Sequence, residues 1–155
     1  MQFINYFFAS LTTFLGLLIG SILVRIAPEE QKPLEKYLIL LRKILLLFAF
    51  AFLVFYYSNE WRYLTILAAL FAFLSFIECK TKNLPQKSAI TYAALGILFY
   101  LSSKNASLFA IESSLILLHG LPTASLMYSK KEKNHCKIIL YNVGFIIISN
   151  LLFFL

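Results

Sequence analysis

The chain has no aspartate and few charges of either sign. Only 14% of its 155 residues are charged, whereas 61% are hydrophobic. An average soluble domain is about 45–50% apolar and about 25% charged. A water-soluble fold of this size would lack the polar groups needed to cover its surface. The composition therefore indicates a single small membrane domain.

Cysteine is also scarce, which limits disulfide and metal chemistry. Cys79 and Cys136 are too few for a disulfide framework. Together with His135 they lack the C-x-x-C or H-x-x-x-H spacing that is typical of zinc sites. The chain also contains no nucleotide-binding loop, no G-x-S-x-G and no HExxH motif. We therefore expect no metal and no cofactor.

What the chain does have is long apolar runs. A membrane helix needs about 20 mostly apolar residues, and a backbone inside lipid must satisfy its hydrogen bonds within the element. Six runs qualify or nearly qualify, and the fourth is the weakest: 3–24, 38–57, 61–77, 88–102, 106–128 and 137–155. The sequence therefore predicts an all-α, six-helix transmembrane bundle with short loops.

The basic residues predict the orientation of this bundle. Twelve of the fourteen Lys and Arg residues fall in three alternate segments, 25–43, 79–87 and 129–137. The other two connections hold only Arg62 and Lys104. Basic loops stay on the cytoplasmic side. We therefore expect a cell-membrane protein with both termini outside, and no nucleic-acid partner despite the net charge of +7.

Two ionisable residues lie inside the predicted fifth helix. Glu112 is about six positions into it, and His119 follows seven residues later on the same face, about 10 Å along the axis. A charged group at such depth costs on the order of 3 kcal/mol. The pair predicts a proton or cation site. The alternative is structural: a protonated Glu112 that bonds a neighbouring helix, and a His119 that is only packed.

A helix break is expected beside His119. Pro122 cannot donate to the carbonyl of Leu118, and Gly120 loosens the same turn. Transporters often bind substrates at broken helices near mid-membrane. Gly and Pro are, however, also common in ordinary membrane helices.

The predicted last helix offers polar partners to the fifth. If the two helices are antiparallel, counting from the connection at 129–136 places Asn142 at the depth of Thr123. The same count places Asn150 near the depth of Glu112. We therefore expect a polar seam formed by Glu112, His119, Thr123, Asn142, Ser149 and Asn150. A Glu112 that faces lipid, far from the last helix, would contradict the seam.

The first helix carries a face of small residues. They are Ser10, Thr13, Gly16 and Gly20. Gly16 and Gly20 form a G-x-x-x-G pair, which permits close approach of two helix backbones. We expect this face to pack within the chain, and a homodimer contact is the alternative.

The connection after the first helix is the most distinctive segment outside the membrane. Pro28 and Pro33 suit helix starts, and Glu29 and Glu30 suit the positive end of a helix dipole. The alternative is a loop that docks a partner or binds an ion.

Three classes of function remain open. The first is a small transporter- or channel-like protein that uses Glu112 and His119. The second is a non-catalytic membrane subunit or scaffold, with a homo-oligomer or another membrane protein as partner. The third is an intramembrane enzyme that acts on a lipid-like substrate with the same two residues as acid and base.

Overall fold

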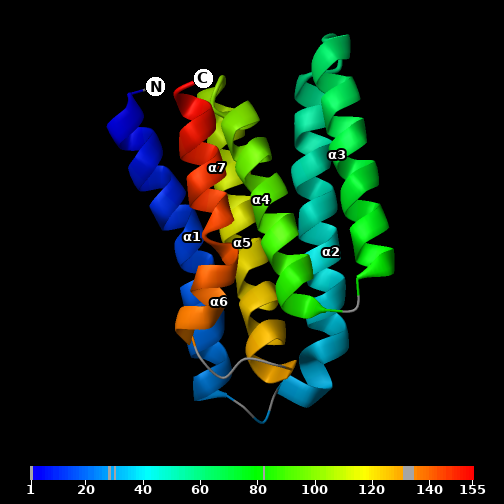
Figure 1. Cartoon of the computed structure of the whole chain (residues 1–155), viewed down its shortest axis with the longest axis vertical. Coiled ribbons are helices and arrows are strands. Elements are labelled where there is room, and N and C mark those ends of the chain that lie inside the picture. The colour runs from blue at the N-terminus through cyan, green and yellow to red at the C-terminus, as the bar shows by residue number, and fades with distance from the viewer. Residues whose placement is uncertain (1, 28, 30, 82, 131–134) are drawn as a thin grey trace.

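The computed structural model describes residues 2–27, 29, 31–81, 83–130 and 135–155. Every regular element in these residues is a helix, as the sequence predicts. The helices are α1 (Phe3–Ile26), α2 (Gln31–Tyr56), α3 (Trp61–Lys80), α4 (Leu84–Ser102), α5 (Ala106–Lys130), α6 (His135–Asn142) and α7 (Gly144–Phe153). Figure 1 shows them side by side in one bundle, with the two termini at the same end.

Five stretches of the described chain are long and apolar enough to cross a bilayer. They are α1, most of α2, α3, most of α5, and α6 taken together with α7. Helix α4 falls short of this standard although it lies among the others (Figure 1). More than half of its residues are buried, so much of its surface meets protein rather than lipid. The structure thus establishes a multi-pass helical architecture with five candidate spans.

Helices α1 and α5 run in parallel and approach each other at glycines. A Cβ atom added to Gly20 would lie 2.5 Å from the carbonyl oxygen of Leu121, and one added to Gly16 would meet the carbonyl of Leu117 even more closely. A Cβ atom on Gly120 would lie 2.6 Å from the carbonyl carbon of Gly16. Because no side chain separates the backbones here, the backbones of α1 and α5 are in direct contact.

An aromatic core holds α1, α4, α5 and α7 together. The ring of Phe99 in α4 lies 4.8 Å from Phe109, 5.1 Å from Tyr6 and 5.4 Å from Phe145, measured between centroids. All four side chains are at most 9% exposed. Aromatic pairs at such distances stabilise a core beyond their buried area, so this cluster fixes four helices relative to one another.

Helix α3 lies at the edge of the bundle. Its buried residues are Leu67, Leu74 and Ile77, and its main contacts are with α2 and α4. Large apolar side chains such as Phe73 and Phe76 are exposed. In a bilayer, lipid covers such a face, so α3 needs little support from protein.

Helix α2 begins at Gln31, seven residues before the predicted start. The segment 25–43, interpreted as a cytoplasmic loop, is therefore largely helical. Helix α3 also continues past residue 77, to Lys80. Arg42 and Lys43, which the predicted helix 38–57 already includes, lie on a helix that packs against others, and Arg42 is only 7% exposed.

The C-terminal apolar run is divided, although the sequence predicts one helix over 137–155. Helix α6 ends at Asn142 and α7 begins at Gly144. The N–H of Val143 bonds the carbonyl of Leu140, three residues back, at 3.4 Å. Gly96 of α4 lies beside this break, since a Cβ atom there would be 2.9 Å from the carbonyl oxygen of Phe145. The discontinuity coincides with a close approach of the two backbones.

Candidate functional site

Glu112 lies in the interior of the bundle. Its side chain is fully buried, and neither carboxylate oxygen has a hydrogen-bond partner among the described residues. It does not face lipid, which is the geometry that would have contradicted the predicted seam. An unpartnered buried carboxyl group is costly, so Glu112 is a candidate for a role other than folding.

His119 is also buried, at 2% exposed. Its Nδ1 atom lies 3.4 Å from the hydroxyl of Thr123, which donates to the backbone carbonyl of His119 at 2.8 Å. Its Nε2 atom has no partner within the described chain. The ring lies 5.8 Å from that of Tyr92, whose hydroxyl likewise lacks a described partner. Two polar atoms that could hold a ligand or water thus belong to neighbouring rings.

Helix α5 runs without interruption from Ala106 to Lys130, although a break was expected at Gly120 and Pro122. Pro122 is accommodated inside the helix, as is common in membrane proteins. Gly120 serves a different purpose, because it permits the contact with Gly16. The discontinuity in the bundle lies instead at Val143.

The polar residues of α6 and α7 bond within their own helices and also reach partners on α4 and α1. Ser88 of α4 donates to the Asn142 side chain at 2.7 Å. Asn150 donates to the Ser10 hydroxyl of α1 at 3.1 Å, and the Tyr6 hydroxyl donates to the carbonyl of Ser149 at 3.0 Å.

Contact between these residues and α5 is limited. Among the described residues, the hydrogen bond from Asn142 to α5 goes to the sulfur of Met127, at 3.8 Å. Thr123 bonds within its own helix. The six residues of the predicted seam therefore do not form one continuous network. They divide into a pair on α5, Glu112 and His119, and structural hydrogen bonds elsewhere.

The small-residue face of α1 is used inside the chain. Gly16 and Gly20 contact α5, and Ser10 and Thr13 are buried. Ser125 of α5 donates to the carbonyl of Gly20 at 3.3 Å. This face is therefore covered by the chain itself.

The residues singled out near the loops are dispersed. Pro28 and Glu30 lie outside the described residues, Glu29 is exposed, and Pro33 lies in the first turn of α2. His135 stacks on Tyr128 at 5.0 Å between centroids. Within the described ranges, no three His, Cys, Asp or Glu side chains gather as metal ligands.

An ion cluster that sequence reasoning missed joins α2, α3 and α4. Arg42 Nη2 lies 2.7 Å from Glu78 Oε1 and 2.9 Å from Oε2, and Lys87 Nζ lies 3.0 Å from Oε1. A signal was present: Arg42 is 14 residues before the end of α2, and Glu78 is 17 after the start of α3. In an antiparallel hairpin those positions lie at similar depth, so opposite charges there could have been paired.

A cavity of about 250 Å³ extends from this cluster to His119. We call it the His119 cavity. Its walls come from α2, α3, α4 and α5, and its lining residues are Arg42, Lys43, Leu46, Leu47, Phe71, Leu74, Ser75, Glu78, Cys79, Thr91 and His119. His119 is thus a predicted site residue that lines this cavity.

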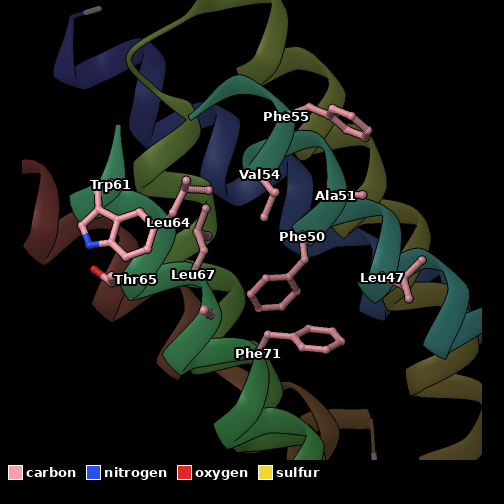
Figure 2. A pocket seen from close by; sticks show the side chains of 11 residues that line it. Leu47, Phe50, Ala51, Val54, Phe55, Trp61, Leu64, Thr65, Leu67 and Phe71 are labelled. Atoms are coloured by element: carbon pink, nitrogen blue, oxygen red, sulfur yellow. The ribbon is translucent and has the colours of Figure 1, made fainter. Parts of the chain in front are cut away.

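A larger hollow of about 550 Å³ lies between α2 and α3. Figure 2 shows Leu47, Phe50, Ala51, Val54 and Phe55 on one wall, with Trp61, Leu64, Thr65, Leu67 and Phe71 on the other. We call it the apolar groove, because Thr65 contributes the only polar side-chain oxygen to its lining. Ala68 also lines the groove.

Comparisons with known proteins leave this geometry as the basis for interpretation. No family model, no curated protein and no solved structure matches the chain.

Proposed function

We propose that the chain is a six-span cell-membrane protein of the transporter- or channel-like class. Both termini lie outside, and the basic segments face the cytoplasm. A proton or small cation passes through the bundle by way of His119 and Glu112. Helix α4 is less apolar than the five candidate spans. Its burial among the other helices supports its crossing of the membrane.

One observation carries this proposal. A carboxylate and an imidazole nitrogen, both buried and without a described partner, lie on one face of α5. The imidazole lines a cavity that reaches the charged residues Arg42, Lys43 and Glu78. Intramembrane ionisable residues of this kind mark ion and proton pathways. Glu112 lies two turns before His119 on the same helix, so water or side-chain motion would connect the two groups.

Proton flux into proteoliposomes tests the proposal. Vesicles containing an entrapped pH dye are given a potassium-diffusion potential, and the rate of internal acidification is measured. Glu112→Gln keeps the shape of the side chain and removes its ionisation. Glu60→Gln is the matched control, because Glu60 is exposed in the connection between α2 and α3.

We expect Glu112→Gln to lower the flux about tenfold or more, as removal of a proton-transferring group does. Glu60→Gln should leave it unchanged. Unchanged flux in Glu112→Gln would remove Glu112 from the mechanism. If vesicles with the wild-type protein show no flux of protons, Na⁺ or K⁺ above that of empty vesicles, the protein is not of the transporter- or channel-like class.

A non-catalytic membrane subunit is the second candidate, and the sparse packing of α3 favours it. An edge helix with exposed Phe73 and Phe76 leaves room for a neighbouring protein. Cross-linking in native membranes would distinguish the two, because a subunit is recovered with one stoichiometric partner.

The lipid-acting enzyme has less support. Seven residues of helix separate His119 from Glu112 by about 10 Å along the axis. An acid and a base that act on one bond must each come within about 3 Å of it.

A further inference from the structure

The His119 cavity lies among α2, α3, α4 and α5, towards the connection between α3 and α4. That connection is at the end of the bundle opposite to the two termini (Figure 1). The cavity volume of about 250 Å³ is smaller than the ~300–1,000 Å³ of sites for drug-sized molecules. Lys43 and Cys79 line the cavity and are exposed, so a small solute can reach it from the protein surface.

The charged groups around this cavity do not balance. Its lining holds two cations, Arg42 and Lys43, and one carboxylate, that of Glu78. The carboxylate is shared with a third cation, because Lys87 Nζ also lies 3.0 Å from Glu78 Oε1. Lys43 has no ion pair among the described residues. Charges removed from water need counter-charges, so this lining favours an anionic ligand.

Arg42 has hydrogen-bond donors beyond those that Glu78 uses. Both of its bonds to Glu78 leave from Nη2, and a guanidinium also donates from Nη1 and Nε. Arg42 is only 7% exposed, so the surrounding helices hold it in place. His119 adds Nε2 to the same lining, a buried nitrogen without a described partner. A carboxylate that accepts from a guanidinium forms one of the stronger hydrogen bonds in proteins.

The other walls of the cavity are mainly apolar. They are formed by Leu46, Leu47, Phe71, Leu74, Ser75, Cys79 and Thr91. The Thr91 hydroxyl already donates to the carbonyl of Lys87 at 2.9 Å. Inorganic phosphate would place polar oxygens against these walls, which offer few donors, whereas a hydrocarbon chain needs none. The lining therefore suits a small molecule with one negative group and a short apolar chain.

We propose that the His119 cavity binds a short-chain monocarboxylate. The carboxylate accepts a hydrogen bond from Nη1 or Nε of Arg42 and pairs with Lys43. The hydrocarbon chain lies against the leucine and phenylalanine side chains of α2 and α3. This binding does not require the proposed proton flux, so the two proposals can fail separately.

Isothermal titration calorimetry of the purified full chain in an uncharged detergent tests the site. The probe is butyrate. Butyramide has a similar shape without the charge, butylammonium carries the opposite charge, and inorganic phosphate lacks the hydrocarbon chain. We expect butyrate to bind at one site per chain, about tenfold or more tightly than any of the three, because a hydrogen bond to a charged group contributes about that factor. Equal binding of butyramide or butylammonium would contradict an anion site, and equal binding of phosphate would assign the cations to an inorganic anion.

Lys43→Gln and Lys36→Gln form a matched pair of variants. Lys43 lines the cavity, whereas Lys36 is exposed on the same helix outside it. Lys43→Gln should weaken butyrate binding about threefold, as the loss of an exposed ion pair does. Lys36→Gln should leave the affinity unchanged. Equal affinities in the two variants would overturn the proposal, and this comparison remains decisive if other variants do not fold.

Glu78→Gln should increase the affinity, which damage to the fold would not do. It removes the carboxylate that competes for Arg42, so we expect butyrate to bind about tenfold more tightly than to wild type. Arg42→Gln should weaken binding by a similar factor. A folded Glu78→Gln variant that binds butyrate no more tightly than wild type would contradict the assignment of Arg42 as the anchor.

Two tryptophan variants locate the hydrocarbon chain. Ser75 lines the cavity, whereas Ala72 does not, and both are exposed on α3. Ser75→Trp fills the cavity and should abolish butyrate binding, and Ala72→Trp should preserve it. Circular dichroism should show equal helical content in both. Equal butyrate affinities in the two variants would place the ligand outside this cavity.

Discussion

Arg42 of α2 donates from one nitrogen to both carboxylate oxygens of Glu78 in α3, at 2.7 and 2.9 Å. The two partners are not equivalent. The Arg42 side chain is 8% exposed and that of Glu78 is 28% exposed. Glu78 has a second cation, Lys87, whereas no other carboxylate is paired with Arg42 in the described structure.

Glu78→Gln should therefore destabilise the protein more than Arg42→Gln. Loss of Glu78 leaves a buried guanidinium unpaired, at a cost of about 3 kcal/mol of unfolding free energy. Loss of Arg42 leaves Glu78 with Lys87, so we expect about 1 kcal/mol. Thermal unfolding in one detergent measures both variants. The opposite order, or equal losses, would show that Arg42 is held by other contacts.

Gly16→Ala should loosen the contact between α1 and α5. The added methyl group would overlap the backbone carbonyl of Leu117, which cannot rotate away. Overpacking of this kind costs about 1–3 kcal/mol. Gly144→Ala is the control, since its methyl group would lie 3.9 Å from the Cβ of Ala93, an ordinary contact. The melting temperatures of the two variants are compared, and equal values would contradict the close approach of α1 and α5.

Cysteine labelling should place Cys79 and Cys136 on the cytoplasmic side. Both are exposed. An impermeant maleimide added to intact cells should leave both unmodified, and it should modify both in inverted vesicles. Ser58→Cys, in a background without native cysteines, should give the reverse result, because it lies in the opposite connection.

The same labelling experiment decides whether α4 crosses the membrane. If α4 does not cross, one fewer span separates Cys79 from Cys136. The two cysteines would then react from opposite sides, and the six-span proposal would be wrong.

Glu112→Leu should stabilise the fold while it abolishes flux. Replacing an unsatisfied buried polar group by an apolar one of similar size removes a penalty of about 1–3 kcal/mol. If Glu112 instead held a neighbouring helix by a hydrogen bond, the same change would destabilise the protein. The melting temperature of Glu112→Leu relative to wild type therefore separates the functional interpretation from the structural one.

Local composition was sufficient to predict that the apolar runs are helical, although not that the last run is divided at Val143. Runs of about 20 apolar residues satisfy their own backbone hydrogen bonds, so their helical state does not depend on neighbours. Helices α1, α3 and α5 begin at the predicted residues 3, 61 and 106. Other boundaries were harder to place, because α2 begins at Gln31, seven residues before the apolar run. Helix α3 continues to Lys80 and so includes Glu78, which pairs with Arg42.

The sequence by itself thus determined an all-helical, membrane-embedded chain, and it singled out two buried ionisable residues on α5. Only the tertiary structure decided which helices meet. It placed α1 rather than the last helix along α5, because two glycine faces allow backbones to touch. It also brought Arg42, Glu78 and His119 to one cavity from three helices. Such neighbours depend on how helices pack across the bundle, and the hydropathy of successive residues does not specify that packing.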